Sequence, residues 1–267
     1  MFRKESVANQ LIFLTGATSG VGEQLAYLLA KKQARLILSG RNQTKLAEVK
    51  ANCREYTLQP IYTACLDLTQ PKTIQPTMEH VYENYGVPSI LINCAGIGLF
   101  RSFVDMDFEQ VEQIYQINLF GTMALTKTVT KEMIQSKQSG IVVNIASQGG
   151  KMPSPKSSIY GSSKAALIAF SDTLRLELAP YNIQVLTVNP GPIVTNFFEQ
   201  ADETGNYLEA VKDYALEPEE VAIEIVEGIE FRKREVNLPS YMQLANLGYR
   251  LFPRVGDYLS QTVFNKK

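Results

Sequence analysis

The sequence predicts an α/β protein, a single domain built on a doubly wound parallel sheet. Short apolar runs alternate with amphipathic helical stretches along the chain, and most of these runs are apolar on both faces, as the central strands of a parallel sheet are. The 267 residues, 45% of them hydrophobic, can supply a sizeable core, and no shift in composition marks a second domain. We therefore predict one domain over residues 1–267.

Seven apolar runs are predicted to be strands, at residues 11–14, 35–38, 61–66, 90–93, 140–145, 184–189 and 235–238. Helical patterns lie between them, at 21–32, 108–133 and 158–178. Asn42 is a plausible cap for the helix after the second strand, and Thr69 followed by Gln70 and Pro71 starts another. Pro218, among acidic residues, is predicted in the first turn of a later helix.

Composition and charge exclude several function classes. The net charge of -1 gives no reason to expect nucleic acid as a partner. Cys53, Cys65 and Cys94 are widely spaced, which argues against a disulfide framework and a zinc site, and the single histidine, His80, excludes a multi-histidine metal site. The first residues, "MFRKESVANQ", do not resemble a signal peptide, and no run reaches the length of a membrane span. We expect a soluble cytoplasmic protein without a metal.

The first predicted strand runs directly into the glycine-rich segment "TGATSGVG", which contains Gly16, Gly20 and Gly22. Such a turn between a strand and a helix lets backbone amides approach a pyrophosphate, and the helix dipole favours the negative charge. The spacing matches the common GxGxxG pattern only loosely. The alternative to a dinucleotide site is a tight connection without a ligand.

The end of the second strand bears on which dinucleotide binds. An acidic residue there would accept hydrogen bonds from the ribose hydroxyls of NAD, whereas an arginine would pair with the 2′-phosphate of NADP. The sequence reads Leu38-Ser39-Gly40-Arg41-Asn42, with a guanidinium and no carboxylate. This favours NADP(H), the alternative being that Arg41 is a solvated residue at a helix start.

The glycine spacing, together with Tyr160-x-x-x-Lys164, resembles the classical short-chain dehydrogenase/reductase family over residues 11–195. Further motifs match in order: Asp67 after the third strand, "NCAG" at 93–96, Asn118 in "QINLFG", Ser147 after the fifth strand, and "NPGPIVT" at 189–195. Cys94 departs from the family's NNAG, which puts the fine positioning of that loop in question.

The resemblance implies a Rossmann-like fold, NADP(H) as cofactor and hydride transfer between its nicotinamide and a carbonyl/alcohol pair. The implied cofactor contacts are Gly16, Thr18, Ser19, Gly20, Val21, Gly22, Arg41, Asp67, Asn93, Ala95, Gly96, Pro190, Gly191, Ile193 and Thr195. The implied catalytic residues are Ser147, Tyr160, Lys164 and Asn118.

The chemistry of these residues fits that reaction. Tyr160 would donate the proton that the carbonyl oxygen needs as charge develops, and Ser147 would donate a hydrogen bond to that oxygen. A free tyrosine has a pKa of about 10, and the cation of Lys164, one helical turn away, would lower it. Asn118 would interrupt its helix locally and help to hold a water near Lys164. The alternative is that these are ordinary packed or surface residues.

Two loops are expected to select the substrate, at 147–160 and 195–217. The second carries Phe197, Phe198, Tyr207 and Leu208 among polar residues, as a closing lid would, or as a surface helix pair with aromatic anchors would. If it is a lid, the substrate is apolar or has an apolar tail.

The C-terminal extension, 239–267, is rich in large apolar residues. It could cover the substrate mouth, pack on a partner subunit or lie on a membrane surface, and packing on this or a neighbouring chain is favoured. The helices at 108–133 and 158–178 resemble those that pair subunits in the family, so a homodimer or homotetramer is expected.

Two other functions remain as alternatives: a non-catalytic NADP-binding sensor, which need not retain Ser147, Tyr160 and Lys164, and a nucleotide-sugar epimerase or dehydratase, a group with a larger substrate domain.

Overall fold

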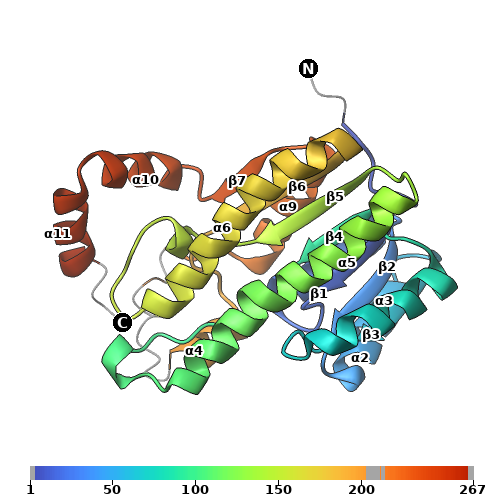
Figure 1. The fold of residues 1–267 in the computed structure, drawn as a ribbon, viewed down its shortest axis with the longest axis horizontal. Coiled ribbons are helices and arrows are strands. Elements are labelled where there is room, and N and C mark those ends of the chain that lie inside the picture. The colour runs from blue at the N-terminus through green and yellow to red at the C-terminus, as the bar shows by residue number, and fades with distance from the viewer. Residues whose placement is uncertain (1–3, 203–210, 212–213, 264–267) are drawn as a thin grey trace.

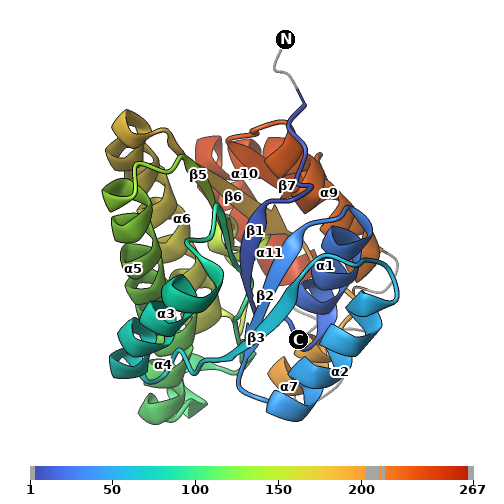
Figure 2. The same ribbon diagram turned by 90° about the vertical axis from the view of Figure 1, so that its right-hand side faces the viewer.

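The fold is a single seven-stranded sheet covered by helices on both faces (Figures 1 and 2), seen in a computed structural model that describes residues 4–202, 211 and 214–263. All strand pairs are parallel and the order is β3-β2-β1-β4-β5-β6-β7. The doubly wound parallel sheet is thereby confirmed. The strands are β1 Leu11–Thr15, β2 Arg35–Gly40, β3 Ile61–Cys65, β4 Ile90–Asn93, β5 Gly140–Ile145, β6 Ile183–Pro190 and β7 Glu235–Leu238.

Helices α1 (Gly20–Lys31), α2 (Gln43–Arg54) and α9 (Pro218–Glu230) cover one face of the sheet. Helices α3 (Pro71–Tyr85), α5 (Thr122–Gln135) and α6 (Ser158–Leu178) cover the other face (Figure 2). Each layer buries an apolar stripe against side chains that alternate along the strands, so that Ile12 and Leu14 of β1 face one layer and Phe13 faces the other. This two-sided burial explains why the strands read as continuous apolar runs.

The local signals at helix starts act as predicted in most places. Asn42 caps α2 by accepting a hydrogen bond from the Lys45 amide at 3.0 Å. Pro218 lies in the first turn of α9. Helix α3 begins at Pro71, where Thr69 makes no cap and instead donates to Asp67 Oδ1 at 2.8 Å.

The long helical pattern from residue 108 is not one regular helix. Helix α4 (Phe108–Tyr115) continues through a π-helical turn (Gln116–Gly121) into α5. At Gly121 a Cβ would lie 2.5 Å from the Leu68 carbonyl oxygen, so this wide turn packs directly on the loop after β3. The interruption contains Asn118, as predicted.

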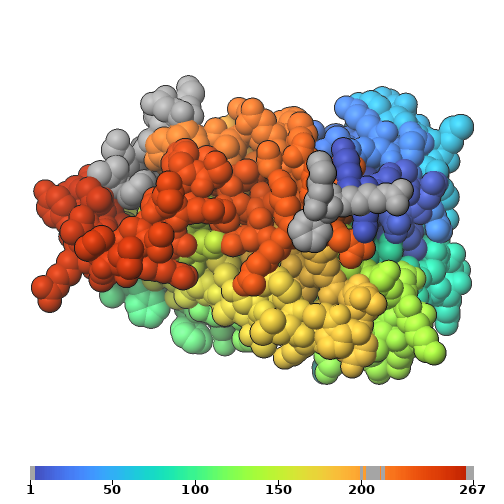
Figure 3. Space-filling model, turned by 90° about the horizontal axis from the view of Figure 1, so that it is seen from above, coloured from blue at the N-terminus to red at the C-terminus, as the bar shows by residue number. Residues whose placement is uncertain are grey.

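The end of the described chain forms two short helices, α10 (Met242–Leu251) and α11 (Pro253–Val263), at one end of the molecule (Figures 1 and 3). Helix α10 buries none of its residues. The favoured packing of this extension on the same or a neighbouring chain stays a prediction, because exposed residues on α10 do not show what covers them. Among the described residues, none of the helices has the length and apolar character needed to cross a membrane.

Candidate active site

A cavity of about 600 Å³ lies at the carboxyl ends of the central strands. Its lining includes a residue just after each of five strands: Gly16 after β1, Cys94 after β4, Ser147 after β5, Gly191 after β6 and Pro239 after β7. β1 pairs with β2 on one side and with β4 on the other, so the direction of winding reverses there. Ligands of open α/β sheets bind at such a switch point.

The glycine turn forms one wall of the cavity through Gly16, Ser19, Gly20, Val21 and Gly22. Gly16 and Gly20 have φ values of +68° and +52°, a backbone region that favours glycine. A Cβ on Gly16 would lie 2.8 Å from the Ala95 amide nitrogen, and one on Gly22 would lie 2.0 Å from the Gly16 carbonyl oxygen. Ser19, at the N-cap of α1, makes no capping hydrogen bond with its side chain. The turn therefore offers uncapped amides at a helix start, which fits a pyrophosphate.

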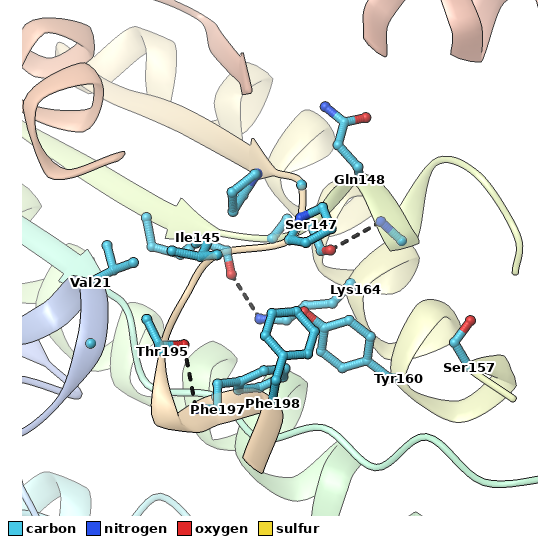
Figure 4. A pocket seen from close by; sticks show the side chains of 18 of the residues that line it. Val21, Ile145, Ser147, Gln148, Ser157, Tyr160, Lys164, Thr195, Phe197 and Phe198 are labelled. Carbon is cyan, nitrogen blue, oxygen red and sulfur yellow. Dashed lines mark hydrogen bonds between the residues drawn. The ribbon is translucent and has the colours of Figure 1, made fainter. Parts of the chain in front are cut away.

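Ser147, Tyr160 and Lys164 line the same cavity (Figure 4). Ser147 stands directly after the Ala146 that follows β5, while Tyr160 and Lys164 lie one turn apart on α6. The Lys164 side chain is 5% exposed, and its Nζ donates to the Ile145 carbonyl oxygen at 2.8 Å. Ser147, from the end of β5, and the two residues of α6 thus line one cavity.

The pKa of Tyr160 is raised above its ordinary value of 10, so the prediction that Lys164 lowers it is wrong in this structure. Burial is the main cause, and a hydrogen bond with Ser147 offsets part of it. Lys164 Nζ lies 6.0 Å from the centre of the Tyr160 ring, and burial lowers the pKa of Lys164 itself to about 8. An amine that is partly neutral and lies at that distance stabilises the negative charge of the Tyr160 phenolate only weakly.

Asn118 does not line the cavity but braces a loop that does. Its Oδ1 accepts from the Ile97 amide at 2.9 Å, and its Nδ2 donates to the Ile97 carbonyl oxygen at 2.8 Å and to Ser163 Oγ at 3.1 Å. A Cβ on Gly96 would lie 3.2 Å from both Asn118 Oδ1 and Lys164 Nζ. The π-helical turn thereby places an amide within reach of the loop and of the lysine.

Hydrogen bonds from the backbone hold the loop after β4, where Cys94 replaces an asparagine of the family motif. Thr15 Oγ1 accepts from the amides of Cys94 and Ala95 at 3.0 and 3.1 Å. The backbone is therefore held from β1, independently of the Cys94 side chain. Burial raises the pKa of the Cys94 thiol to about 12.

The predicted cofactor contacts divide into two groups. Those that line the cavity are Gly16, Ser19, Gly20, Val21, Gly22, Ala95, Gly96, Pro190, Gly191, Ile193 and Thr195. Those that do not are Thr18, Arg41, Asp67 and Asn93.

The residues of the second group lie near the ends of β2 and β3 or in the core. Thr18 packs against Gly40, whose Cβ would lie 3.1 Å from Thr18 Cγ2, so the glycine turn adjoins the end of β2. Arg41 follows Gly40, is exposed, and forms no ion pair with any carboxylate of the described residues. Asp67 Oδ1 accepts from the Thr69 amide at 2.9 Å, which shapes the loop after β3.

The side chain of Asn93 is turned into the core and does not line the cavity, so its contact with the cofactor stays a prediction. It is 2% exposed and donates to Thr126 Oγ1 at 3.0 Å and to Asn144 Oδ1 at 2.8 Å. These bonds tie β4 to α5 and β5 through the Asn93 Nδ2, while its buried Oδ1 makes no hydrogen bond among the described residues.

Aromatic rings cover Tyr160 on the side of helix α7 (Asn196–Ala201), as Figure 4 shows for Phe197 and Phe198. The ring centres of Phe100 and Phe197 lie 5.7 and 5.6 Å from that of Tyr160, and Phe198 stacks 5.9 Å from Phe100. The Phe100 amide donates to the Ala201 carbonyl oxygen at 2.7 Å, which fastens α7 to the loop after β4. Phe197 and Phe198 line the cavity, which supports the lid interpretation. Tyr207 and Leu208 lie outside the described residues.

Several lining residues were not identified from the sequence. Phe100 also lines the cavity, whereas Gln148, Met152 and Tyr214 come from the two loops expected to select the substrate. Phe100 could have been found, because it follows the carboxyl end of a predicted strand. Tyr241 and Met242 come from the C-terminal extension, which agrees with the alternative that this extension covers the substrate mouth.

Comparisons with known proteins agree with this geometry. Residues 10–206 match the family model described as short chain dehydrogenase. The mouse protein "Dehydrogenase/reductase SDR family member 7B" is 33% identical over 247 residues, covering 90% of this chain and 76% of its own. An uncharacterised oxidoreductase of Staphylococcus saprophyticus is 31% identical over 187 residues, covering 70% of this chain and 80% of its own.

Solved structures show the same fold. A short-chain dehydrogenase from Sphingobium yanoikuyae in complex with NADPH has a TM-score of 0.79 and 27% identity, covering 92% of this chain and 95% of its own. A family protein from Burkholderia phymatum in complex with NAD has a TM-score of 0.85 and 18% identity, covering 94% and 96% of the two chains. With its cavity, its glycine turn and these relatives, the chain belongs to the short-chain dehydrogenase/reductase family of oxidoreductases.

Proposed function

We propose that this protein is an NADP(H)-dependent oxidoreductase that interconverts an apolar carbonyl compound and its alcohol, with Tyr160 as the acid/base. The observation that carries the proposal is the convergence of Ser147, Tyr160 and Lys164 in the cavity that the glycine turn also lines. A binding protein without chemistry would have no need to gather these groups beside the nucleotide wall.

The residues divide the work as follows. When bound, NADP(H) supplies or accepts the hydride. The amides at Gly20 and Val21 would hold its pyrophosphate. In the direction of reduction, Tyr160 gives its phenolic proton to the carbonyl oxygen, and Ser147 donates a hydrogen bond to the same oxygen as negative charge develops. Because burial raises the pKa of Tyr160, the phenol stays protonated near neutral pH, which suits this proton donor.

Lys164 and Asn118 would support the reaction without contacting the carbonyl group, Lys164 through its charge and hydrogen bonds and Asn118 by positioning the backbone. Lys164 Nζ, held by the Ile145 carbonyl, is placed to donate to ribose hydroxyls and to supply positive charge when it is protonated. Asn118 fixes the Ile97 backbone and, through Ser163, the helix that carries Tyr160.

The preference for NADP(H) rests on Arg41. It follows the end of β2, beside the glycine turn, and the cofactor-selecting position has no carboxylate. The Sphingobium yanoikuyae enzyme was solved with NADPH. A free guanidinium at this place suits a 2′-phosphate through charged, bidentate hydrogen bonds.

The apolar substrate class rests on the cover over Tyr160. Phe100, Phe197 and Phe198 pack beside the phenol, and Met152 and Met242 also line the cavity. A wholly hydrophilic carbonyl compound would lose its hydration there without gaining polar partners. We also propose a homodimer or homotetramer, supported by exposed Phe108, Phe120 and Leu176 on the α4–α5 and α6 surfaces.

NADPH oxidation with a panel of ketosteroids, 3-oxoacyl thioesters, quinones and simple aldehydes tests the activity. With the best substrate, Tyr160→Phe should lower kcat by about 10²-fold or more, as expected on removing a general acid. Tyr181→Phe, at an exposed tyrosine, is the matched control and should retain activity. Turnover retained by Tyr160→Phe would remove Tyr160 from the mechanism, and no NADPH oxidation with any carbonyl would favour a sensor.

Cofactor choice has its own test. Arg41→Ala should raise the Kd for NADPH by about tenfold or more, since a charged hydrogen-bonded pair is lost, and should leave the Kd for NADH nearly unchanged. Arg54→Ala, at the far end of α2, is the matched control. Equal loss of affinity for both dinucleotides would contradict the assignment.

A further inference from the structure

The two C-terminal helices leave an unusual amount of apolar surface uncovered. We call α10, α11 and the Phe252 between them the tail hairpin. Its apolar side chains with 48% to 74% of their surface exposed are Leu244, Leu247, Leu251, Phe252, Val255, Tyr258 and Leu259. Leu244, Leu247 and Leu251 are spaced by three and four residues and therefore form one stripe along α10. Isolated exposed apolar residues are common, but stripes on both of two adjacent helices call for an occupant.

Specific contacts join the two helices of the tail hairpin. Tyr249 donates its hydroxyl hydrogen to Asp257 Oδ1 at 2.8 Å, joining α10 to α11. A Cβ on Gly256 would lie 2.2 Å from Tyr249 Cδ2, so the tyrosine ring packs directly on the α11 backbone. At the start of the hairpin, the Met242 amide donates to the Pro239 carbonyl oxygen at 3.1 Å. The contacts between the helices thus leave the leucines facing outward.

The charge of the tail distinguishes two candidates for what covers these apolar stripes: a second copy of the tail and an anionic lipid surface. The segment 239–267 carries four basic residues and one acidic residue, whereas residues 1–238 carry 22 basic and 26 acidic residues. Arg250 and Arg254 are exposed on the hairpin itself. A symmetric pairing of two tails would bring two cationic segments together, which repel each other. An anionic surface with an apolar interior complements both the charge and the leucines.

We propose that the tail hairpin lies on an anionic lipid surface, with its apolar stripes in the headgroup region and Arg250 and Arg254 near lipid phosphates. Amphipathic helices of low overall hydrophobicity bind in the plane of such an interface. The hairpin also adjoins the cavity, because Tyr241 and Met242, at its start, line the cavity. Provided that the proposed function holds, this would bring the cavity mouth close to a membrane-dissolved apolar carbonyl compound.

The test is flotation of the full-length protein with vesicles of phosphatidylcholine alone and of phosphatidylcholine containing phosphatidylserine. The wild type should float with the anionic vesicles, with binding that weakens as salt is raised. Leu247→Glu should reduce this binding by about tenfold or more, because it places a carboxylate in the apolar stripe. Leu58→Glu is the matched control, a fully exposed leucine in the loop between α2 and β3, and should float as the wild type does.

A second variant separates charge from apolar contact. Arg250→Gln combined with Arg254→Gln should weaken binding to anionic vesicles about tenfold and should not change the fraction that floats with neutral vesicles. Light scattering without lipid measures the oligomeric state of each protein. The proposal is overturned if the wild type does not float, if Leu247→Glu floats equally well, or if Leu247→Glu dissociates an oligomer without affecting flotation. Flotation does not require turnover, so a failure of the catalytic proposal would leave this result unaffected.

Discussion

Burial of Lys164 should make the stability of the protein depend on pH in a way that its removal abolishes. The ordinary pKa of 10.5 falls to about 8 in the folded protein, so the unfolded chain binds more protons than the folded one between these values. Stability therefore rises with pH across this range, because the folded state no longer carries a buried ammonium. A lowering of the pKa from 10.5 to about 8 corresponds to about 3 kcal/mol in total.

The change is Lys164→Met, which keeps the length of the side chain and removes the titrating group. Urea unfolding of the purified protein without nucleotide gives the free energy of unfolding of both proteins from pH 7 to pH 10. The free energy of unfolding of the wild type should rise by about 2 to 3 kcal/mol relative to the variant across that window, and most of the rise should fall above pH 8. The lost hydrogen bond to the Ile145 carbonyl oxygen shifts the difference by a constant, since both protonation states of the amine can donate it.

Other titrating groups cancel in this comparison when they behave alike in both proteins. Cys94, whose charge interacts with that of Lys164, has a pKa raised to about 12, so it does not ionise in the folded protein within the window. Two stability curves that stay parallel from pH 7 to pH 10 would refute the reasoning. They would show that water or a carboxylate keeps the ammonium solvated in the fold.

Two further predictions concern the walls of the cavity. Gly22→Ala should weaken NADPH binding about tenfold or more in a fluorescence titration, because its Cβ would lie 2.0 Å from the Gly16 carbonyl oxygen. Gly248→Ala, whose Cβ meets nothing within 4 Å, is the control and should bind NADPH as the wild type does. Equal affinities of the two variants for NADPH would show that the glycine turn accommodates the Cβ without loss of binding. Phe197→Ala should raise the KM for an apolar carbonyl compound about tenfold, because one aromatic contact is lost, and should change the KM for a small hydrophilic carbonyl compound little. Phe103→Ala, at an exposed ring, is the control. Equal changes in KM for both substrates would argue against the lid.

The strands and the order of elements could be read from the sequence because local patterning encodes them. Runs such as 90–93 and 140–145 are apolar on both faces, and burial in a parallel sheet requires that. The glycine turn, Ser147, Tyr160 and Lys164 could be found because short motifs carry them, and each is placed by the strand or helix beside it. The interruption at Asn118 was foreseen through the family resemblance, whereas its bonds to Ile97 and Ser163 were not.

The direction of the Tyr160 pKa could not be predicted from the spacing of the tyrosine and the lysine. Spacing places two side chains on one face of a helix, but it does not give their desolvation, nor the carbonyl that draws Lys164 toward Ile145. Asn93 is a similar case. Its motif suggests a contact with the cofactor, whereas the packing of β4 between α5 and β5 turns the amide to Thr126 and Asn144.

The sequence by itself determined the fold class, the strands, the glycine turn and the candidates Ser147, Tyr160 and Lys164, because these depend on periodicity, glycine placement and motifs within a few residues. Only the tertiary structure decided how the aromatic cover closes over Tyr160, how burial shifts the acidity of Tyr160 and Lys164, and which side chains of the tail hairpin stay uncovered. Those properties depend on contacts between segments far apart in the chain, and on how much water such contacts exclude.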